Sequence, residues 1–172
     1  MRVIAGVAKG RKLIKPGGDL IRPTKDRVKE AIFNSLHSYG LVDNRTFLDL
    51  FSGTGSLGIE ALSRGAKSVV FVDNNAEAID CVKSNVDMLN YDSASKILKA
   101  DALSFLEKGE YFDVALLDPP YRFKQWGELL KRIKAHTLVI ESPEPIMLKH
   151  GWQIIKSQKY GQTHLLIASH QM

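Results

Sequence analysis

Asp118-Pro119-Pro120-Tyr121 is the stretch whose residue types most clearly suggest chemistry. It follows an apolar run over residues 111–117, which predicts a buried strand. Two prolines end such a strand, because proline lacks an N–H for the ladder and fixes φ. On this stiff shelf Tyr121 would stack on a planar base, while Asp118 and the Pro119 carbonyl would accept protons of its exocyclic amino group. The alternative is a Pro-Pro turn that carries a surface acid.

A second stretch, Asp49-Leu50-Phe51-Ser52-Gly53-Thr54-Gly55-Ser56-Leu57-Gly58, contains G-x-G-x-x-G, and Asp73 ends the next predicted strand. This pattern is shared by dinucleotide enzymes and other binders of nucleotide-like cofactors, and the Asp73 carboxylate could accept hydrogen bonds from both ribose hydroxyls of such a cofactor. Asp49 favours one ligand, because an acid before the loop would repel a pyrophosphate at the helix N-terminus and attract an ammonium. S-adenosylmethionine has such an ammonium and no phosphate, whereas NAD has two phosphates.

Acids follow five consecutive predicted strands, namely Asp49, Asp73, Asp101, Asp118 and Glu141. In open α/β sheets the ligand crevice lies beyond the carboxyl ends of the strands. Asp101, or the Ala102 N–H, would meet the adenine edge there. Any single acid could instead be the N-cap of the following helix.

Alternating strand and helix patterns predict a doubly wound, mostly parallel sheet of seven strands with helices on both faces. The expected strands are 46–51, 68–73, 96–100, 113–117, 137–141, 152–156 and 164–168. The expected helices between them are 55–64, 75–90, 102–108 and 123–134. The last two strands share a short turn at Tyr160-Gly161, so one of them should be antiparallel.

The N-terminal part predicts a small extension over residues 1–40, packed on a main domain of residues 41–172. Residues 2–14 can form two short strands around Lys9-Gly10, and Thr24 is a plausible N-cap for a helix that runs to about His37. Residues 1–30 hold nine Lys/Arg and three Asp/Glu, although the whole chain has a net charge of only +5. This basic arm is either a handle for a polyanion or a solvated lysine-rich edge.

Size and composition bound the remaining possibilities. The 172 residues suggest one domain, and the single cysteine, Cys81, excludes an internal disulfide framework and fits a reducing cytoplasm. No apolar run approaches 18 residues and no secretory signal is present, so neither a membrane span nor secretion is expected. The five histidines lack metal-ligand spacing, so no metal is expected.

The chain closely resembles the bacterial 16S ribosomal RNA guanine-N2 methyltransferases of the D type. Four stretches carry the match: Lys9-Gly10-Arg11-Lys12-Leu13, the block from Arg22-Pro23-Thr24 to Asn34, the stretch Asp49–Ala66, and Asp118–Tyr121 with Lys159-Tyr160-Gly161. The resemblance spans nearly the whole chain, and the Arg-Pro-Thr block is its most specific part. It implies a Rossmann-like class I methyltransferase that uses S-adenosylmethionine on one guanine of the small ribosomal subunit.

The resemblance also assigns roles to residues. The cofactor residues would be Asp49, Phe51, Gly53, Gly55, Asp73, Asn74, Asp101, Ala102 and Asp118. The base would lie at Asp118, Pro119, Pro120 and Tyr121. The RNA contacts would be Arg2, Lys9, Arg11, Lys12, Arg22, Thr24 and Arg27. The partner would be 16S ribosomal RNA in an assembling 30S subunit, and the enzyme is expected to act as a cytoplasmic monomer.

Two departures from the family pattern and three rival functions remain open. The usual Pro-Gly-Gly turn before the fifth strand is replaced by Lys134-Ala135-His136-Thr137, after a short segment from Tyr121. Asp73 stands where a glutamate is common. The rivals are an adenine-N6 or cytosine-N4 DNA methyltransferase, which would need more chain for target recognition, a non-catalytic RNA-binding assembly factor, and an NAD oxidoreductase.

Overall fold

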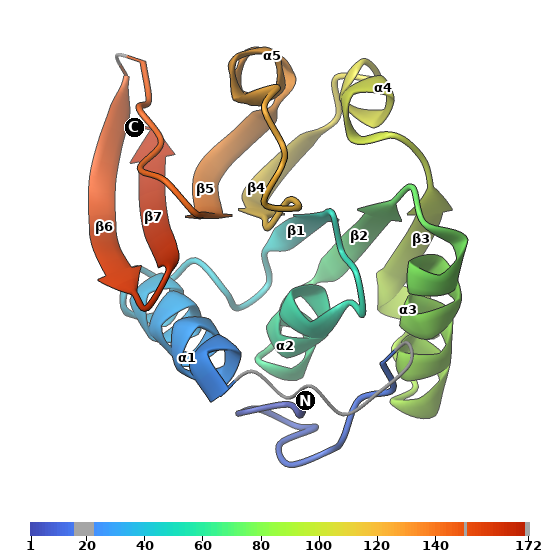
Figure 1. The fold of residues 1–172 in the computed structure, drawn as a ribbon. Coiled ribbons are helices and arrows are strands. Elements are labelled where there is room, and N and C mark those ends of the chain that lie inside the picture. Colours follow the sequence, from blue (N-terminus) through green and yellow to red (C-terminus); the bar gives the residue numbers. More distant parts are fainter. Residues whose placement is uncertain (16–22, 150, 171–172) are drawn as a thin grey trace.

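The computed structural model describes residues 1–15, 23–149 and 151–170, with the side chains of residues 23–25 left out. Within them lies a seven-stranded sheet in the order β3-β2-β1-β4-β5-β7-β6 (Figure 1). Its strands are β1 (Thr46–Leu50), β2 (Ser68–Asp73), β3 (Ser95–Lys99), β4 (Tyr111–Leu117), β5 (Lys134–Ser142), β6 (Trp152–Tyr160) and β7 (Thr163–His170). The first five strands run parallel, and β7 pairs antiparallel with both β5 and β6. The predicted Rossmann-like class I fold and the antiparallel strand near the C-terminus are therefore confirmed.

Helices cover both faces of the sheet because the central strands are apolar on both sides. Figure 1 shows the three helices α1 (Pro23–Ser38), α2 (Ser56–Ser63) and α3 (Ala76–Met88) on one face. The helices α4 (Ala102–Leu106) and α5 (Trp126–Arg132) lie on the other face. Alternate residues of β1 serve the two layers: Phe47 joins the core under α1 and α2, whereas Leu48 joins the core under α4 and α5.

The strand order reverses between β1 and β4, which are hydrogen-bonded neighbours in the sheet. From β1 the chain moves outward through β2 to β3, and it then returns past β1 to β4. The loops after β1 and β4 therefore diverge to opposite faces and leave a crevice at the carboxyl ends of the strands. The register aligns Asp49 with Leu116, so Asp49 and Asp118 both reach this crevice.

The structure corrects the prediction around the fifth strand. The fifth strand is expected to begin at Thr137, but β5 begins at Lys134, where Lys134 pairs with Tyr111 and Ala135 with Phe112. Ala135 is buried and its neighbours are more exposed, so the alternation that a strand needs starts here. Helix α5 is also shorter than expected: it begins at Trp126, because the chain first turns back so that the Phe123 N–H donates to the Pro120 carbonyl.

The predicted N-terminal hairpin is reduced to one isolated antiparallel bridge between Arg2 and Lys12. The Val3 N–H donates to the Arg11 carbonyl and the Gly10 N–H donates to the Val3 carbonyl, but the residues between them also bind other elements. The Ile4 and Ala5 N–H groups donate to the Glu60 carboxylate of α2, so they cannot form a ladder. We call residues 1–15 the N-terminal arm. Whether residues 1–40 and 41–172 are separable units stays a prediction.

Candidate functional site

A cleft of about 1180 Å³ lies at the carboxyl ends of the parallel strands. All five predicted acids line it, and the shelf residues Pro119, Pro120 and Tyr121 line it with them. Of the other predicted cofactor residues, Phe51, Gly53, Asn74 and Ala102 also line it. The structure thus brings together in one cavity residues that the sequence spreads over almost a hundred positions, as expected for residues that follow parallel strands.

Asp49 lies near the end of β1 and its side chain is buried. One of its carboxylate oxygens accepts a hydrogen bond from the Gly58 N–H at 2.9 Å, so it satisfies a donor in the first turn of α2. Burial raises the pKa of Asp49 to about 8, the Gly58 N–H opposes this shift, and the charges of Asp118 and Asp73 add to it. A nearby cation would stabilise the ionised form of this buried carboxyl and so favour its deprotonation.

The glycine loop is held by the acid of the next strand. The Gly53 N–H donates to Asp73 at 2.9 Å, and the other Asp73 oxygen accepts from the Asn75 N–H. A carboxylate has about four acceptor positions, so Asp73 keeps capacity for ligand hydroxyls. Phe51 begins the loop with φ +67°, a left-handed conformation that non-glycine residues rarely adopt, and its ring packs edge-on against Phe123 at 5.1 Å.

Two glycines of the motif act through packing. Gly55 has φ +76°, precedes α2 and is buried, and it does not line the cleft. A Cβ on Gly58 would lie 2.3 Å from the Phe71 ring of β2, so only glycine lets α2 pack this close to the sheet. Of the predicted cofactor residues, Gly55 is therefore placed in the turn, where it shapes the loop.

Asp101 is the N-cap of α4, because its side chain accepts from the Ser104 N–H at 3.0 Å. The capping alternative for this acid is thus correct, although Asp101 also lines the cleft. Ala102 is the first residue of the helix, and its N–H has no intrahelical acceptor. The site therefore offers an acceptor and a donor side by side at this corner.

The shelf after β4 carries its side chains at the mouth of the cleft. Pro119 is buried, whereas Tyr121 is 53% exposed. Behind the shelf, Phe123 packs edge-on against Trp126 at 5.3 Å, so the loop rests on an aromatic base. Arg122 joins the lining next to Tyr121 and adds a cation to this side of the cleft.

The basic side chains predicted to bind RNA lie outside the cleft, because none of Arg2, Lys9, Arg11, Lys12 and Arg27 lines it. All five are exposed, and Arg2 lies 4.0 Å from the Asp26 carboxylate. Arg22 and the Thr24 side chain fall outside the described residues.

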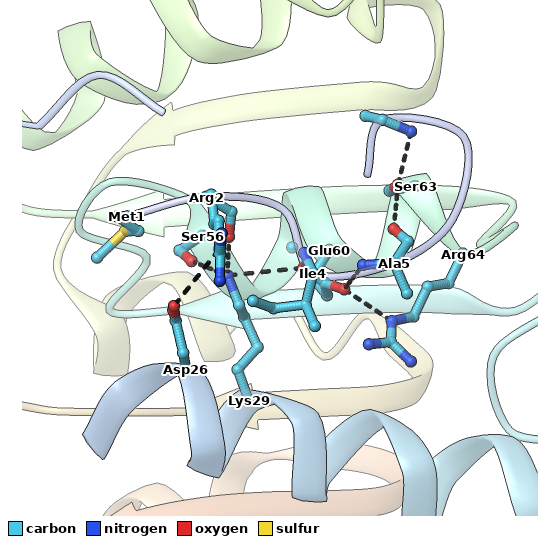
Figure 2. Close-up of polar contacts among 12 residues, drawn as sticks. Met1, Arg2, Ile4, Ala5, Asp26, Lys29, Ser56, Glu60, Ser63 and Arg64 are labelled. Carbon is cyan, nitrogen blue, oxygen red and sulfur yellow. Dashed lines mark hydrogen bonds and ion pairs between the residues drawn. The ribbon is translucent and has the colours of Figure 1, made fainter. Parts of the chain in front are cut away.

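The arm that carries most of these cations is fixed by a buried network (Figure 2). Glu60, fully buried in α2, accepts from Ile4 and Ala5 and binds Arg64 at 2.8 Å. Lys29 of α1 lies 3.6 Å from Glu60, and its ammonium donates to the Arg2 carbonyl and to Ser56. Burial lowers the pKa of Lys29, and the Glu60 and Asp26 carboxylates oppose this shift.

Further hydrogen bonds fix the N-terminal arm at its middle and at its C-terminal end. Ser63 donates to the Ala5 carbonyl and accepts from the Ala8 N–H (Figure 2). At Ile14, the N–H donates to Asn85 and the carbonyl accepts from Asn85 and from the Cys81 thiol. Cys81 is itself buried, and its burial raises the pKa of the thiol.

Several cleft residues could not be read from the sequence. Lys29, Met1, Ser52, Gln125 and the turn 161–163 all line the cavity. Ser52 is informative because its hydroxyl oxygen is buried and has no hydrogen-bond partner among the described residues. A buried polar atom of this kind requires a partner, which a bound ligand can supply.

The chemistry of these groups fits S-adenosylmethionine. The cleft provides carboxylates for an ammonium and for ribose hydroxyls, the Ala102 N–H for an adenine edge, and room for a second ring above the shelf. Among the described residues, no group of three or more His, Cys, Asp or Glu side chains is arranged to hold a metal ion. No helix in the described part of the chain is long and apolar enough to cross a membrane.

Comparisons with known proteins agree with this geometry. A family model described as "Conserved hypothetical protein 95" matches residues 1–169. A Bacillus subtilis relative named "Putative rRNA methyltransferase YlbH" is 41% identical over 145 residues, which cover 82% of this chain and 78% of that protein. A Haemophilus influenzae relative named "Ribosomal RNA small subunit methyltransferase D" is 34% identical over 174 residues, covering 94% and 89%.

The solved structures give the same result. An Escherichia coli structure named "Putative methyltransferase yhhF" matches with a TM-score of 0.88 at 27% identity and covers 99% of this chain and 98% of its own. The predicted resemblance to the D-type methyltransferases, the enzyme class and the methyl donor are confirmed. The chain therefore belongs to the family described as conserved hypothetical protein 95 and is an S-adenosylmethionine-dependent methyltransferase.

Proposed function

We propose that this enzyme methylates the exocyclic N2 amino group of a guanine in 16S ribosomal RNA. The observation that carries the proposal is the single cleft in which the acids of the proposed methyl-donor site, Asp49, Asp73 and Asp101, meet the Asp-Pro-Pro-Tyr shelf. The relatives named as small subunit methyltransferases support ribosomal RNA as the substrate class. The shelf supports an amino group as the methyl acceptor, because the Asp118 carboxylate and the Pro119 carbonyl can accept hydrogen bonds from its N–H groups.

The proposed roles divide the cleft into two halves. Asp49 holds the ammonium of S-adenosylmethionine, Asp73 and Asn74 hold its ribose, and Asp101 and Ala102 meet its adenine. Phe51 and Gly53 shape the wall between these points, and Asp118 closes it. When bound, S-adenosylmethionine supplies a methyl group on a cationic sulfonium, which is a good leaving group.

The shelf prepares the acceptor nitrogen. Tyr121 stacks on the guanine and holds its plane, while the Asp118 carboxylate and the Pro119 carbonyl accept the two amino protons. These hydrogen bonds favour a more tetrahedral nitrogen, whose lone pair would otherwise be delocalised into the ring. Positive charge builds on this nitrogen during transfer, and the Asp118 carboxylate stabilises it in place. Pro120 stiffens the backbone between these groups, so orientation is fixed before the reaction.

The test is methyl transfer to small ribosomal subunits, and to 16S RNA, from a strain that lacks the enzyme, with the modified nucleoside identified by mass spectrometry. We expect N2-methylguanosine from the wild-type protein. Asp118→Ala should reduce the rate by at least about 100-fold, far more than it weakens cofactor binding. Asp92→Ala, an exposed acid after α3, is the matched control and should behave as wild type.

Other outcomes would assign other functions. Methylated adenine or cytosine from a DNA substrate would favour the DNA methyltransferase alternative. RNA binding without any transfer would favour a non-catalytic assembly factor. An Asp118→Ala variant with undiminished activity would remove the shelf from the mechanism.

We further propose that the enzyme acts as a monomer, in the cytoplasm, on a partly assembled 30S subunit. The anchored arm supports this view, because its cations lie on a fixed surface beside the cleft, as a large folded substrate requires. Sedimentation of the pure protein tests the monomer, and transfer rates on naked RNA against assembly intermediates test the form of the substrate.

A further inference from the structure

A second hollow, with a volume of about 650 Å³, lies between α1 and the edge strand β6. We propose that this groove binds the sugar-phosphate backbone of the RNA strand next to the methylated guanine. The proposal rests on the RNA substrate of the proposed function and adds a surface that the sequence motifs do not assign. We call it the α1–β6 groove.

The α1–β6 groove continues the walls of the cleft. Tyr160 at the end of β6 lines the groove, and the turn that follows it, residues 161–163, lines the cleft. On α1, Arg27 lines the groove while its neighbours Asp26 and Val28 line the cleft. A strand whose base enters the cleft can therefore pass directly from one hollow into the other.

The lining suits a ribose-phosphate chain. Arg27 and Lys156 supply cations, and neither forms an ion pair within the described part of the protein. Ser35 and Ser38 donate their hydroxyls to the carbonyls of Ala31 and Ser35, so their oxygens keep lone pairs that can accept from a 2′-hydroxyl. Glu30 is the acid of this lining, so the surface is polar with a net positive charge.

The position of the groove answers a requirement of base flipping. A flipped guanine remains joined to nucleotides on both sides, and both must leave the cleft along the protein surface. Figure 1 shows α1 between the N-terminal arm and β6, so the arm and the groove lie on different sides of this helix. The arm can receive one flank of the strand, and the groove receives the other.

Two substitutions test the groove without touching the cleft. Asn34→Asp keeps the size of an exposed groove residue and adds a negative charge, and Lys156→Gln removes a cation. The matched control is Lys96→Gln, an exposed lysine on β3 at the opposite edge of the sheet. Cofactor affinity by calorimetry should be unchanged in all three variants, which shows that each is folded.

The measurement is the affinity for 16S RNA by filter binding over a series of salt concentrations. Lys156→Gln should lower the slope of log affinity against log salt by about 0.7 to 1, the value for one phosphate that is no longer neutralised. Asn34→Asp should weaken RNA binding several-fold, and Lys96→Gln should match the wild type. The proposal is overturned if both groove variants bind RNA as the control does; the lysines would then only protect an edge strand.

Two comparisons separate this proposal from a contact with a ribosomal protein and from the proposed function. Weaker binding to assembled subunits with unchanged binding to naked RNA would mean that the groove contacts a ribosomal protein, and would also overturn it. The experiment measures RNA binding, so it tests the groove even if the wild-type enzyme makes no N2-methylguanosine. The absence of N2-methylguanosine would contradict only the proposed function.

Discussion

At the scale of single residues, Asp49 combines two duties whose demands conflict. Its carboxyl caps α2 through the Gly58 N–H, yet burial and two neighbouring acids raise its pKa to about 8 in the ligand-free protein. An ammonium in contact with it would stabilise the ionised form and lower that pKa. Cofactor binding below pH 8 must then release a proton from Asp49.

We therefore predict that cofactor affinity increases as the pH is raised from 6 to about 8, by at most tenfold per unit, and levels off above the pKa. Calorimetry in buffers of different ionisation enthalpy measures both the affinity and the released proton. Asp49→Asn should bind more weakly and lose the pH dependence. An affinity that is flat over this range in the wild type would show that Asp49 does not face the ammonium.

The same shift has a consequence for stability. A carboxyl with a raised folded pKa favours the folded state below its ordinary pKa of 3.8, and this contribution is lost as the pH rises through about 8. From pH 5 to pH 9, the unfolding free energy of the wild type should therefore fall relative to that of Asp49→Asn. Urea unfolding at these two pH values gives the difference.

Tyr121 provides a third prediction at this scale. The proposed stacking uses the ring, so Tyr121→Phe should change the transfer rate only about twofold, whereas Tyr121→Ala should lose the roughly 1–3 kcal/mol of stacking. At subsaturating RNA this loss lowers the rate by about 5- to 150-fold. Equal losses in the two variants would place the contribution in the hydroxyl and contradict a stacking role.

At the scale of elements, Glu60 of α2 is the residue on which the arm depends. It is fully buried and satisfies two arm N–H groups while facing Lys29 and Arg64 (Figure 2). Glu60→Gln removes a buried charge that faces the buried Lys29 and the partly buried Arg64, so we expect a loss of about 3 kcal/mol in the free energy of unfolding. Denaturant unfolding measures it, and hydrogen exchange should show faster exchange at the Ile4 and Ala5 amides.

The matched control lies on the next helix. Asp80 pairs with Lys83 at 3.7 Å on the exposed side of α3, and both side chains are mostly exposed. Asp80→Asn should therefore cost less than about 0.5 kcal/mol. If Glu60→Gln were as mild as this control, the network would not hold the arm.

The elements also show what a sequence can and cannot tell. The glycine loop, the strand-end acids and the shelf were predictable, because each depends on neighbours within a few positions. The Lys29–Glu60 pair was not, since burial of a charge is decided by elements that meet only in the fold. The start of β5 at Lys134 was missed for a related reason: its pairing with Tyr111 of β4 outweighs the weak local preference of a short polar segment.

At the scale of the whole molecule, the charge is unevenly distributed. The first 30 residues hold nine Lys/Arg and three Asp/Glu, so their net charge exceeds the +5 of the whole chain, and the arm within them is fixed to α1, α2 and α3 by buried contacts. A polyanion that meets this surface is held beside the cleft and displaces counterions as it binds. The enzyme therefore combines an acidic cleft for a cationic donor with a basic flank for its acceptor.

This separation leads to a prediction about salt. Replacing Arg2, Lys9, Arg11 and Lys12 by Gln should reduce the slope of log RNA affinity against log salt concentration by about 0.7 for each phosphate that the arm no longer neutralises. Cofactor affinity should stay the same. Folding should be preserved, because Lys29 binds the carbonyl of Arg2 and the exposed side chains make none of the buried arm contacts. As a control, Lys67, Lys83, Lys96 and Lys99 replaced together remove the same charge from exposed positions before β2, on α3 and on β3. An equal change of slope in both variants would mean that net charge alone attracts the RNA, and an unchanged slope in the arm variant would mean that the arm does not bind it.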